Sequence, residues 1–319
     1  MNSNYFEDLQ PSDIKQIGTD LDKSNRIKND PLVSIVVPSY NHADYIEQCL
    51  ESILHQDYPN FELIVIDDGS SDASPEILKR LQKKHGFALE LNKNQGLSKT
   101  LNKGLKHYAK GKYLTFCASD DKWFPGKLSK QVAFLESNAE YAMVYGKAWY
   151  IDEYGKDILE RNQSKTHYKG GHIFKDLILQ RFHPPVNYML RADVVKSLGY
   201  YREHIWAEDF DMNLRIAENH PIGFLDDYLS YYRINYSIPS KLLNFETVYS
   251  HKDSIDLFKH RAEYAEAIKA WHYRNFKWYA PFAIGKKIAL RGLILNLDQI
   301  SKKDFWISLL VLIFKYHKK

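Results

Sequence analysis

The first part of the chain alternates between short apolar runs and longer stretches whose apolar residues recur at helical spacing. Apolar runs of about four to eight residues, rich in β-branched side chains, are typical of strands buried on both faces. Such runs occupy residues 32–37, 61–66, 87–92 and 112–117. Between the first two, Ile46, Leu50, Ile53 and Leu54 share one face of a helix. This segment therefore predicts a strand, a helix and a second strand.

Two further helices are expected between the later strands, over residues 74–84 and 97–109. The first should begin with Ser74 as its N-terminal cap and Pro75 at its first helical position. Alternating strands and helices joined by short links predict an α/β fold, with a mostly parallel sheet covered by helices on both faces.

The alternation weakens after residue 140. Strands are expected over residues 141–146, 187–191 and 224–235, and a helix over residues 207–219. From residue 240 onward the pattern is helical and interleaves aromatic with basic side chains. We therefore expect a polar leader at residues 1–30, an α/β domain at 31–239 with halves at 31–125 and 126–239, and a helical extension at 240–319.

Charge is distributed unevenly over the 319 residues, although the net charge is only +4. Residues 259–319 hold 13 Lys and Arg against 4 Asp and Glu, a balance of +9, which leaves −5 on the remainder. A basic tail behind an acidic body suggests an anionic partner for the tail. The alternative is a helical appendage that packs on the main domain. Apart from the basic and aromatic residues of this tail, nothing in the sequence points to nucleic acid as its partner.

Several features favour a cytoplasmic protein. Cys49 and Cys117 both lie in apolar segments, as expected of buried thiols in a reducing compartment. The first residues do not have the pattern of a signal peptide. The longest apolar run, Phe305–Phe314, is shorter than the ~20 residues of a spanning helix. We therefore expect a cytoplasmic location, with peripheral contact to the inner face of the membrane as the hypothesis for the tail.

Polar clusters follow each of the four expected strands of the first half. They read PSYN at residues 38–41, DDGS at 67–70, NQG at 94–96 and ASDD at 118–121. In parallel sheets of this kind, ligands bind beyond the carboxyl ends of the strands. The clusters should therefore converge on one edge and form a binding site.

Two of these clusters suggest specific chemistry. Acids at 67–68 could accept hydrogen bonds from a base or ribose, with Gly69 allowing close backbone approach; the alternative is an Asx turn. The adjacent Asp120 and Asp121 would repel each other unless a cation lies between them, and Mg²⁺ or Mn²⁺ prefers such oxygen ligands together with phosphates. The alternative is a solvated turn before Pro125. No glycine-rich G-x-G-x-x-G motif follows the first strand, which argues against a dinucleotide dehydrogenase.

A third acidic cluster, Glu208, Asp209 and Asp211, opens the expected helix at 207–219. Acids are favoured at helix N-termini by the helix dipole, so a purely structural role is one interpretation. In the other, one of them is a general base whose pKa is raised by partial burial beside Trp206.

Taken in order, these blocks resemble the family 2 glycosyltransferases of the GT-A fold, of the inverting, non-processive bacterial type. The resemblance rests on VSIVVPSYNHADYIEQCLESILHQDYPNFELIVIDDGSSD, NKNQGLSKTLNKGL, FCASDDKWFPGKL, AEDFDMNLRIAE and YYRIN, and covers residues 31–235. The Gln-x-x-Arg-Trp signature of processive synthases is absent.

The resemblance implies a role for each matching residue. Pro38, Tyr40 and Asp68 match positions that hold the nucleotide base and ribose, and Asn41, Asp67 and Asn94 fall in the same donor-binding clusters. Asp120 and Asp121 match aspartates that contact the ribose and, through Mn²⁺ or Mg²⁺, the diphosphate. Asp209 matches the catalytic base, with Glu208 beside it. The implied reaction is a single displacement with inversion.

The implied donor is a nucleotide-diphosphate sugar, with UDP as the expected nucleotide. The implied acceptor is a saccharide or lipid-linked saccharide in surface-polysaccharide assembly. The alternative is a non-catalytic nucleotide-sugar-binding or scaffold protein that retains the fold. A nucleotidyltransferase is disfavoured because no glycine-rich loop with a basic residue follows the first strand.

The sequence departs from the family pattern at two positions. Ala118 replaces the first acid of the usual Asp-x-Asp-Asp, and Asn235 stands where many members have a histidine. Arg233 is the nearby cation that could pair with the diphosphate. On the expected acceptor side, Trp149, Tyr150 and Trp206 are candidates for sugar contacts, although packing explains each equally well. His183 could contact a sugar or phosphate, but a packed or exposed histidine beside a Pro-Pro turn is the favoured interpretation.

Overall fold

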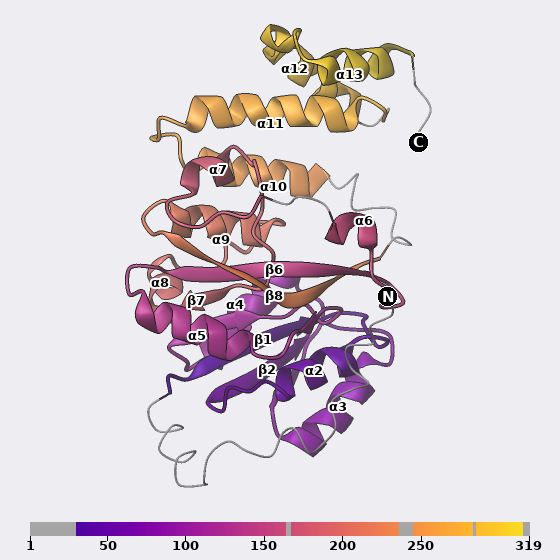
Figure 1. Cartoon of the computed structure of the whole chain (residues 1–319). Helices are drawn as coiled ribbons and strands as arrows, with labels where there is room; N and C mark the ends of the chain where they lie inside the picture. Colours follow the sequence, from indigo (N-terminus) through magenta and orange to yellow (C-terminus); the bar gives the residue numbers. More distant parts are fainter. Residues whose placement is uncertain (1–29, 164–166, 236–244, 283–284, 315–319) are drawn as a thin grey trace.

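An eight-stranded mixed sheet forms the centre of the computed structural model, which describes residues 30–163, 167–235, 245–282 and 285–314 (Figure 1). The strand order is β3-β2-β1-β4-β7-β6-β8-β5. Four parallel strands form one half: β1 (Val33–Ser39), β2 (Phe61–Asp67), β3 (Ala88–Leu91) and β4 (Tyr113–Phe116). The prediction of an α/β fold with a mostly parallel sheet is confirmed.

The other half of the sheet is built around two long parallel strands, β6 (Met143–Asp152) and β8 (Ile222–Ile234). The short β7 (Met189–Arg191) joins the halves, because it pairs antiparallel with both β4 and β6. At the far edge, the two-residue β5 (Lys122–Trp123) pairs antiparallel with β8. The loop that carries Asp120 and Asp121 is therefore anchored to both halves.

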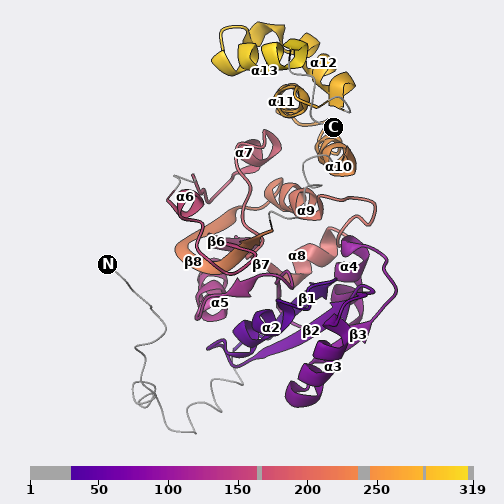
Figure 2. The same ribbon diagram turned by 90° about the vertical axis from the view of Figure 1, so that its right-hand side faces the viewer.

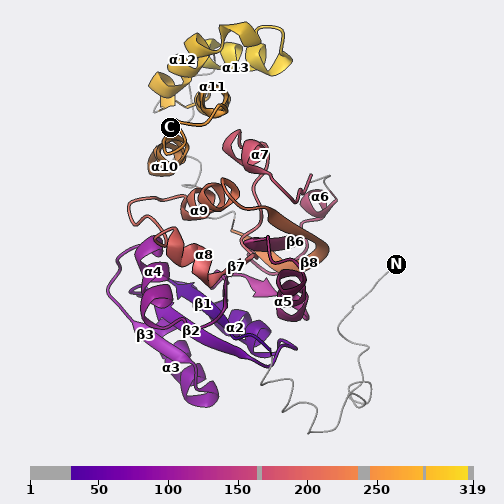
Figure 3. The ribbon, with the colours of Figure 1, turned by 90° about the vertical axis from the view of Figure 1, so that its left-hand side faces the viewer.

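Helices cover both faces of the sheet and define two cores (Figures 2 and 3). On one face, Val33, Ile35 and Val37 of β1 pack with α2 (Ile46–Leu54), α3 (Ser74–His85) and α5 (Lys127–Ser137). On the other face lie α4 (Leu97–His107), α7 (Phe174–Ile178), α8 (Ala192–Ser197) and α9 (Glu208–Ala217). Because successive side chains of β1 point to opposite faces of the sheet, Val36 belongs to this second core.

The C-terminal helices stack outward from the second face, as all three views show (Figures 1–3). They are α10 (Phe245–Asp256), α11 (Tyr264–Tyr279), α12 (Lys286–Leu295), the 3₁₀ turn η3 (Leu297–Gln299) and α13 (Lys303–Phe314). Ile255, Phe258 and Trp271 belong to the core on this second face, whereas a separate small core begins at Phe276. Helix α11 therefore contributes to the main core with its first half and to the small core with its second half. The expected domain division at residue 240 falls before α10 and α11, which both contribute to the main core.

Among the described residues, no helix is long and apolar enough to cross a membrane. The expected leader lies outside these residues except for Asp30. The predicted cap of α3 is wrong: Ala73 takes the cap position and the helix starts at Ser74. Instead, Ser74 Oγ accepts a hydrogen bond from the His42 backbone N–H at 3.1 Å, which ties the start of α3 to the loop after β1.

Candidate active site

The loops after β1 and β2 are tied together at the predicted edge of the sheet. The Asn41 backbone N–H donates to Ser70 Oγ at 2.8 Å, and the Ser71 N–H donates to Asn41 Oδ1 at 2.8 Å. Asn41 adopts a positive φ of 53°, which asparagine tolerates better than most residues. The preceding Tyr40 is 47% exposed, so a ligand can reach its ring.

Asp67 organises the loop that follows β2. Its carboxylate accepts hydrogen bonds from the backbone N–H of Gly69 (3.2 Å) and of Ser70 (2.9 Å), and from the Ser70 hydroxyl (2.6 Å). This is the Asx-turn arrangement that the sequence left open. Gly69 is required here because φ is +81° and an added Cβ would lie 2.6 Å from the Asn94 backbone nitrogen. The contact of Asp67 with a donor stays a prediction.

Asp68 holds the neighbouring loop, which leads into α4. Its two carboxylate oxygens accept hydrogen bonds from the backbone N–H groups of Gln95 and Gly96, each at 2.9 Å. The residue is buried, whereas Asn94 is exposed at the same edge. The structure thus brings together the clusters after β1, β2 and β3. Asp68, in the cluster after β2, positions the backbone of the cluster after β3.

The Asp120–Asp121 pair lies in a tight turn closed by a 3.0 Å hydrogen bond from the Asp121 N–H to the Ala118 carbonyl oxygen. The two carboxylates have different surroundings. Asp121 Oδ1 accepts the Arg233 backbone N–H at 2.8 Å. Asp120 is partly exposed, and its Oδ2 lies 3.8 Å from His42 Nε2. Asp120 is therefore the carboxylate of the pair that is more open to a ligand.

His42 is a site residue that the sequence reasoning missed. Its Nδ1 lies 2.7 Å from Ser119 Oγ, and its other ring nitrogen faces Asp120. The signal was available, since His42 directly follows the first polar cluster. It links the loop after β1 to the loop after β4.

Arg233 acts as a buried clamp beneath the same turn. Its Nε donates to the Asp120 carbonyl oxygen at 2.7 Å, Nη1 to the Asp152 carbonyl oxygen at 3.0 Å, and Nη2 to Gln48 Oε1 at 3.1 Å. The guanidinium group also lies 4.4 Å from the ring centre of Tyr45. These contacts join β8, β6 and α2. The expected contact with a diphosphate stays a prediction.

The donor atoms at this edge fit a divalent cation held jointly with a substrate. Asp120 and Asp121 supply hard oxygen ligands, of the kind that Mg²⁺ and Mn²⁺ prefer. Within the described parts of the chain, no group of three or more His, Cys, Asp or Glu side chains is arranged to hold a metal by itself. Mg²⁺ commonly binds through one or two carboxylates plus phosphate oxygens, and this site offers that number.

Glu208 and Asp209 open α9 and are both partly exposed. Asp209 Oδ1 accepts the Phe210 backbone N–H at 2.7 Å. Burial raises the pKa of both carboxyl groups, and the charge of Asp209 raises the pKa of Glu208 further. Trp206, beside which the sequence predicted this burial, has a side chain that is itself 60% exposed. Asp211 has a structural role, since it is buried and paired with Arg202 and Arg215, each at 2.8 Å.

Tyr232, near the end of β8, connects the two acidic clusters. Although its side chain is 37% exposed, partial burial of the phenol raises its pKa, and the charges of Asp121, Asp120 and Asp209 raise it further. These three carboxylates, from the loop after β4 and from α9, therefore act on the same side chain. Tyr232 also packs edge-to-face against Tyr150, with ring centres 5.7 Å apart.

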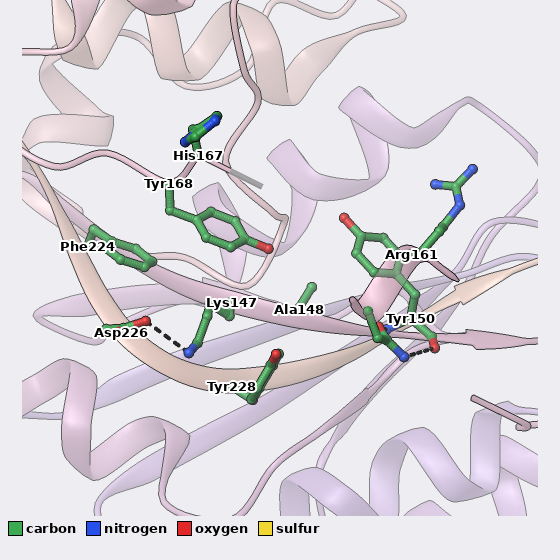
Figure 4. A pocket seen from close by; sticks show the side chains of 10 residues that line it. Lys147, Ala148, Tyr150, Arg161, His167, Tyr168, Phe224, Asp226 and Tyr228 are labelled. Atoms are coloured by element: carbon green, nitrogen blue, oxygen red, sulfur yellow. Dashed lines mark hydrogen bonds and ion pairs between the residues drawn. The ribbon is translucent and has the colours of Figure 1, made fainter. Parts of the chain in front are cut away.

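A pocket of about 500 Å³ lies next to this site, over β6 and β8 (Figure 4). Its lining combines aromatic and basic side chains: Lys147, Ala148, Tyr150, Arg161, Asn162, His167, Tyr168, Phe224, Asp226 and Tyr228. Lys147 pairs with Asp226 at 2.9 Å, and α6 (Leu159–Asn162) contributes Arg161 and Asn162. Of the candidate sugar contacts, Tyr150 lies in this pocket, whereas Trp149 donates its indole N–H to Asp157 at 2.8 Å.

The remaining candidate, His183, packs away from the donor loops. Its ring contacts Phe210 and His251 at centre-to-centre distances of 5.6 and 6.2 Å. Burial lowers the pKa of His183 to about 4, and Arg274 contributes in the same direction. His183 is therefore a neutral imidazole beside the helix of the predicted base.

The family model described as Glycosyl transferase family 2 matches residues 34–199. The chain therefore belongs to this family and is a glycosyltransferase. The match ends before α9, so the predicted base lies outside it.

Related proteins are also named as glycosyltransferases. The uncharacterised glycosyltransferase MJ1057 of Methanocaldococcus jannaschii is 29% identical over 64% of this chain and 71% of its own length. The putative teichuronic acid biosynthesis glycosyltransferase TuaG of Bacillus subtilis is 42% identical over 33% of this chain and 42% of its own length. The amylovoran biosynthesis glycosyltransferase AmsE of Erwinia amylovora is 28% identical over 72% and 85%.

Solved structures share the fold. Residues 1–349 of S. aureus TarS in complex with UDP-GlcNAc match with a TM-score of 0.56 and 20% identity, covering 88% of this chain and 90% of that one. The mannosyltransferase PcManGT of Pyrobaculum calidifontis, in complex with GDP-Man and Mn²⁺, matches with a TM-score of 0.55 and 17% identity, covering 92% and 86%. Both matches cover most of this chain and support the GT-A architecture.

Proposed function

We propose that this enzyme transfers a single sugar from a nucleotide-diphosphate sugar to a hydroxyl group of a saccharide or lipid-linked saccharide, with inversion. The observation that carries the proposal is the convergence of the loops after the parallel strands, with Asp120 and Asp121 on one of them, beside Asp209, whose charge reaches Tyr232 together with theirs. A donor diphosphate beside the first two acids would place its sugar near the third. Asp209 can then take the proton of the attacking hydroxyl group.

The raised pKa of Asp209 suits this role, because a more basic carboxylate accepts a proton more readily. When bound, Mn²⁺ or Mg²⁺ would neutralise charge on the departing diphosphate. The exposed ring of Tyr40 offers a surface for the nucleotide base, and the loops ordered by Asp67 and Asp68 surround it. The pocket over β6 and β8 is the proposed acceptor side, since its aromatic rings and polar groups suit a saccharide.

UDP is the proposed nucleotide, and surface-polysaccharide assembly the proposed process. TarS was solved with UDP-GlcNAc, and PcManGT with GDP-Man and Mn²⁺, so both nucleotides belong in a test panel. TuaG and AmsE are assigned to teichuronic acid and amylovoran biosynthesis, which supports a polysaccharide product. The alternative is a nucleotide-sugar-binding or scaffold protein that retains the fold but does not catalyse sugar transfer.

The test has two stages. First, the thermal stability of the protein is measured with UDP-GlcNAc, other UDP-sugars and GDP-mannose, each with and without Mn²⁺, because a ligand that binds the folded state raises its stability. Second, release of the nucleoside diphosphate is measured for wild type and Asp209→Asn. We expect the variant to bind the donor normally and to lose turnover. Donor binding without turnover in the wild type would favour the scaffold alternative.

We also propose that residues 259–319 contact an anionic membrane surface. More than half of the exposed large hydrophobic side chains in the described parts of the chain lie between Trp278 and Ile313. On α12, Leu290, Ile294 and Leu295 share the exposed face with Lys287 and Arg291. Apolar and basic side chains on one face are typical of helices that lie in a lipid interface.

Vesicle flotation tests this surface. The protein should float with vesicles containing phosphatidylglycerol and not with pure phosphatidylcholine, and Trp306→Ser with Ile307→Ser should weaken the binding. Tyr154→Ser, at an 82% exposed side chain in the loop after β6, is the control and should bind as wild type. If the protein binds neither kind of vesicle and the double variant instead changes its oligomeric state, the surface is an interface between copies of this chain.

A further inference from the structure

The helix α10 packs directly against the segment that carries Glu208 and Asp209. We propose that α10 is part of the catalytic site, and that Ser250 and Ser254 are positioning residues for the base. This inference rests on the proposed function, because it assumes that Asp209 accepts the proton. It goes beyond it by assigning a catalytic contribution to the C-terminal extension.

Ser250 holds the residues immediately before the base. Its Oγ accepts hydrogen bonds from the backbone N–H groups of Trp206 (2.8 Å) and Ala207 (3.0 Å). These two N–H groups lie just before the first turn of α9. The N-terminal cap residue of that helix is Ala207, which offers no side-chain cap. Ser250 is only 3% exposed, so water cannot replace it without rearrangement. A serine on one helix therefore serves as the cap of another.

Ser254 supplies a second anchor, one turn further along α10. Its hydroxyl lies 3.0 Å from Asp211 Oδ1 and also 3.0 Å from the Ser250 carbonyl oxygen. Asp211 is two residues beyond the base and is clamped by Arg202 and Arg215. The two serines thus hold α9 on both sides of Asp209.

His251 lies between the two serines and packs on the residue next to the base. Its ring centre is 4.8 Å from that of Phe210, and its Nδ1 lies 2.9 Å from the Thr247 carbonyl oxygen. That hydrogen bond requires the proton on Nδ1, so Nε2 is the unprotonated nitrogen in the neutral ring. α10 therefore encloses the base with an aromatic wall as well as with hydrogen bonds.

Nothing in the pattern of α10 itself requires these contacts. The family match stops at residue 199, and α10 lies beyond it. Packing alone would be satisfied by the apolar face that includes Ile255. Two buried hydroxyl groups directed at residues 206, 207 and 211 are instead expected if the position of α9 matters. A misplacement of about 1 Å in a catalytic group can cost about a hundredfold in rate.

The experiment compares Ser250→Ala with Ser308→Ala in the full chain. Ser308 is a matched control, because it is also a buried serine of the extension but belongs to α13. Hydrolysis of UDP-GlcNAc or GDP-mannose with Mn²⁺, whichever stabilises the protein, gives kcat and the donor KM. We expect Ser250→Ala to lower kcat about tenfold to a hundredfold, to change the donor KM less than about twofold, and to leave the control as wild type.

The pH profile separates positioning from a general loss of structure. The groups whose pKa values depend on Asp209 come from several elements: Glu208, Tyr188, Tyr201, Tyr232 and His251. Loosening α9 should hydrate Asp209 and move the acidic limb of the kcat profile to lower pH. Ser250→Thr, which retains the hydroxyl group, should restore both the rate and the limb.

The outcomes are distinct. A Ser250→Ala enzyme with the kcat and pH profile of Ser308→Ala overturns the inference, provided that Asp209→Asn measured in parallel is inactive. If Asp209→Asn keeps its turnover, the proposed function itself has failed. If Ser250→Ala does not fold, Ser254→Ala is measured in its place, and wild-type kinetics in that variant likewise overturn the inference.

Discussion

Replacing Glu208 with glutamine should stabilise the enzyme at high pH, at a residue beside the predicted base. Burial and the charge of Asp209 raise the pKa of Glu208 from 4.5 to about 8. Between these values the folded state keeps a proton that the unfolded state has released. The free energy of unfolding therefore falls as the pH rises through this window.

The size of the effect follows from the shift. Each pKa unit corresponds to about 1.4 kcal/mol, so the whole window is worth about 5 kcal/mol and the range from pH 5 to pH 8.5 about 4 kcal/mol. This is an upper bound, because the carboxyl group retains some contact with water. Glu208→Gln removes the titrating group, so the variant should gain up to about 4 kcal/mol over wild type between these two pH values.

Urea denaturation at pH 5, 7 and 8.5 measures the difference. Titrating groups that do not interact with Glu208 contribute equally to both proteins and cancel in the comparison, whereas the charges of Glu208 and Asp209 act on each other. Glu76→Gln is the matched control, since Glu76 is an exposed glutamate in the first turn of α3. A Glu208→Gln variant whose gain is the same at pH 5 and pH 8.5, within about 0.5 kcal/mol, would refute the electrostatic reasoning.

Three other changes have defined outcomes. Asp120→Ala should lose the stabilisation that Mn²⁺ and donor give together in a thermal shift assay, and retention of metal dependence would exclude Asp120 as a ligand. Gly69→Ala should cost more stability than Gly86→Ala by about 1–3 kcal/mol in urea, because both have a positive φ but only the first added Cβ meets backbone within 4 Å; equal costs would contradict the close approach. Arg233→Lys should lower the free energy of unfolding by about 1–3 kcal/mol, because it leaves buried carbonyl groups unpaired, and a stability within about 0.5 kcal/mol of wild type would contradict the clamp.

Much of the donor edge was predictable because the sequence pattern determines where parallel strands end. The apolar runs that became β1, β2 and β4 are each followed by polar residues, and parallel strands place those residues together. The same logic does not extend to side chains whose partners are distant in sequence. Arg233 lies at the expected edge, yet its guanidinium group points to acceptors on the Asp120 loop and β6. No local periodicity encodes that choice.

The role of α10 was unpredictable for a similar reason. Its sequence predicts a helix, and the basic residues that follow suggested a separate extension. What makes it part of the main body is the burial of Ile255 and the direction of Ser250, both of which depend on where α9 lies. The misplaced cap at Ser74 is a smaller case: the cap signal was read locally, whereas its hydroxyl group accepts from His42.

The Arg233 clamp has a consequence for the cost of donor binding. A flexible loop around Asp120 would have to lose conformational entropy each time a donor bound, at about 1–2 kcal/mol for each residue ordered. Here the carbonyl oxygen of Asp120 and the carboxylate of Asp121 are already held by the backbone and guanidinium groups of one buried residue. That ordering is completed when the chain folds. The arginine can therefore strengthen donor affinity without touching the donor, and its loss should appear as weaker binding of the nucleotide sugar.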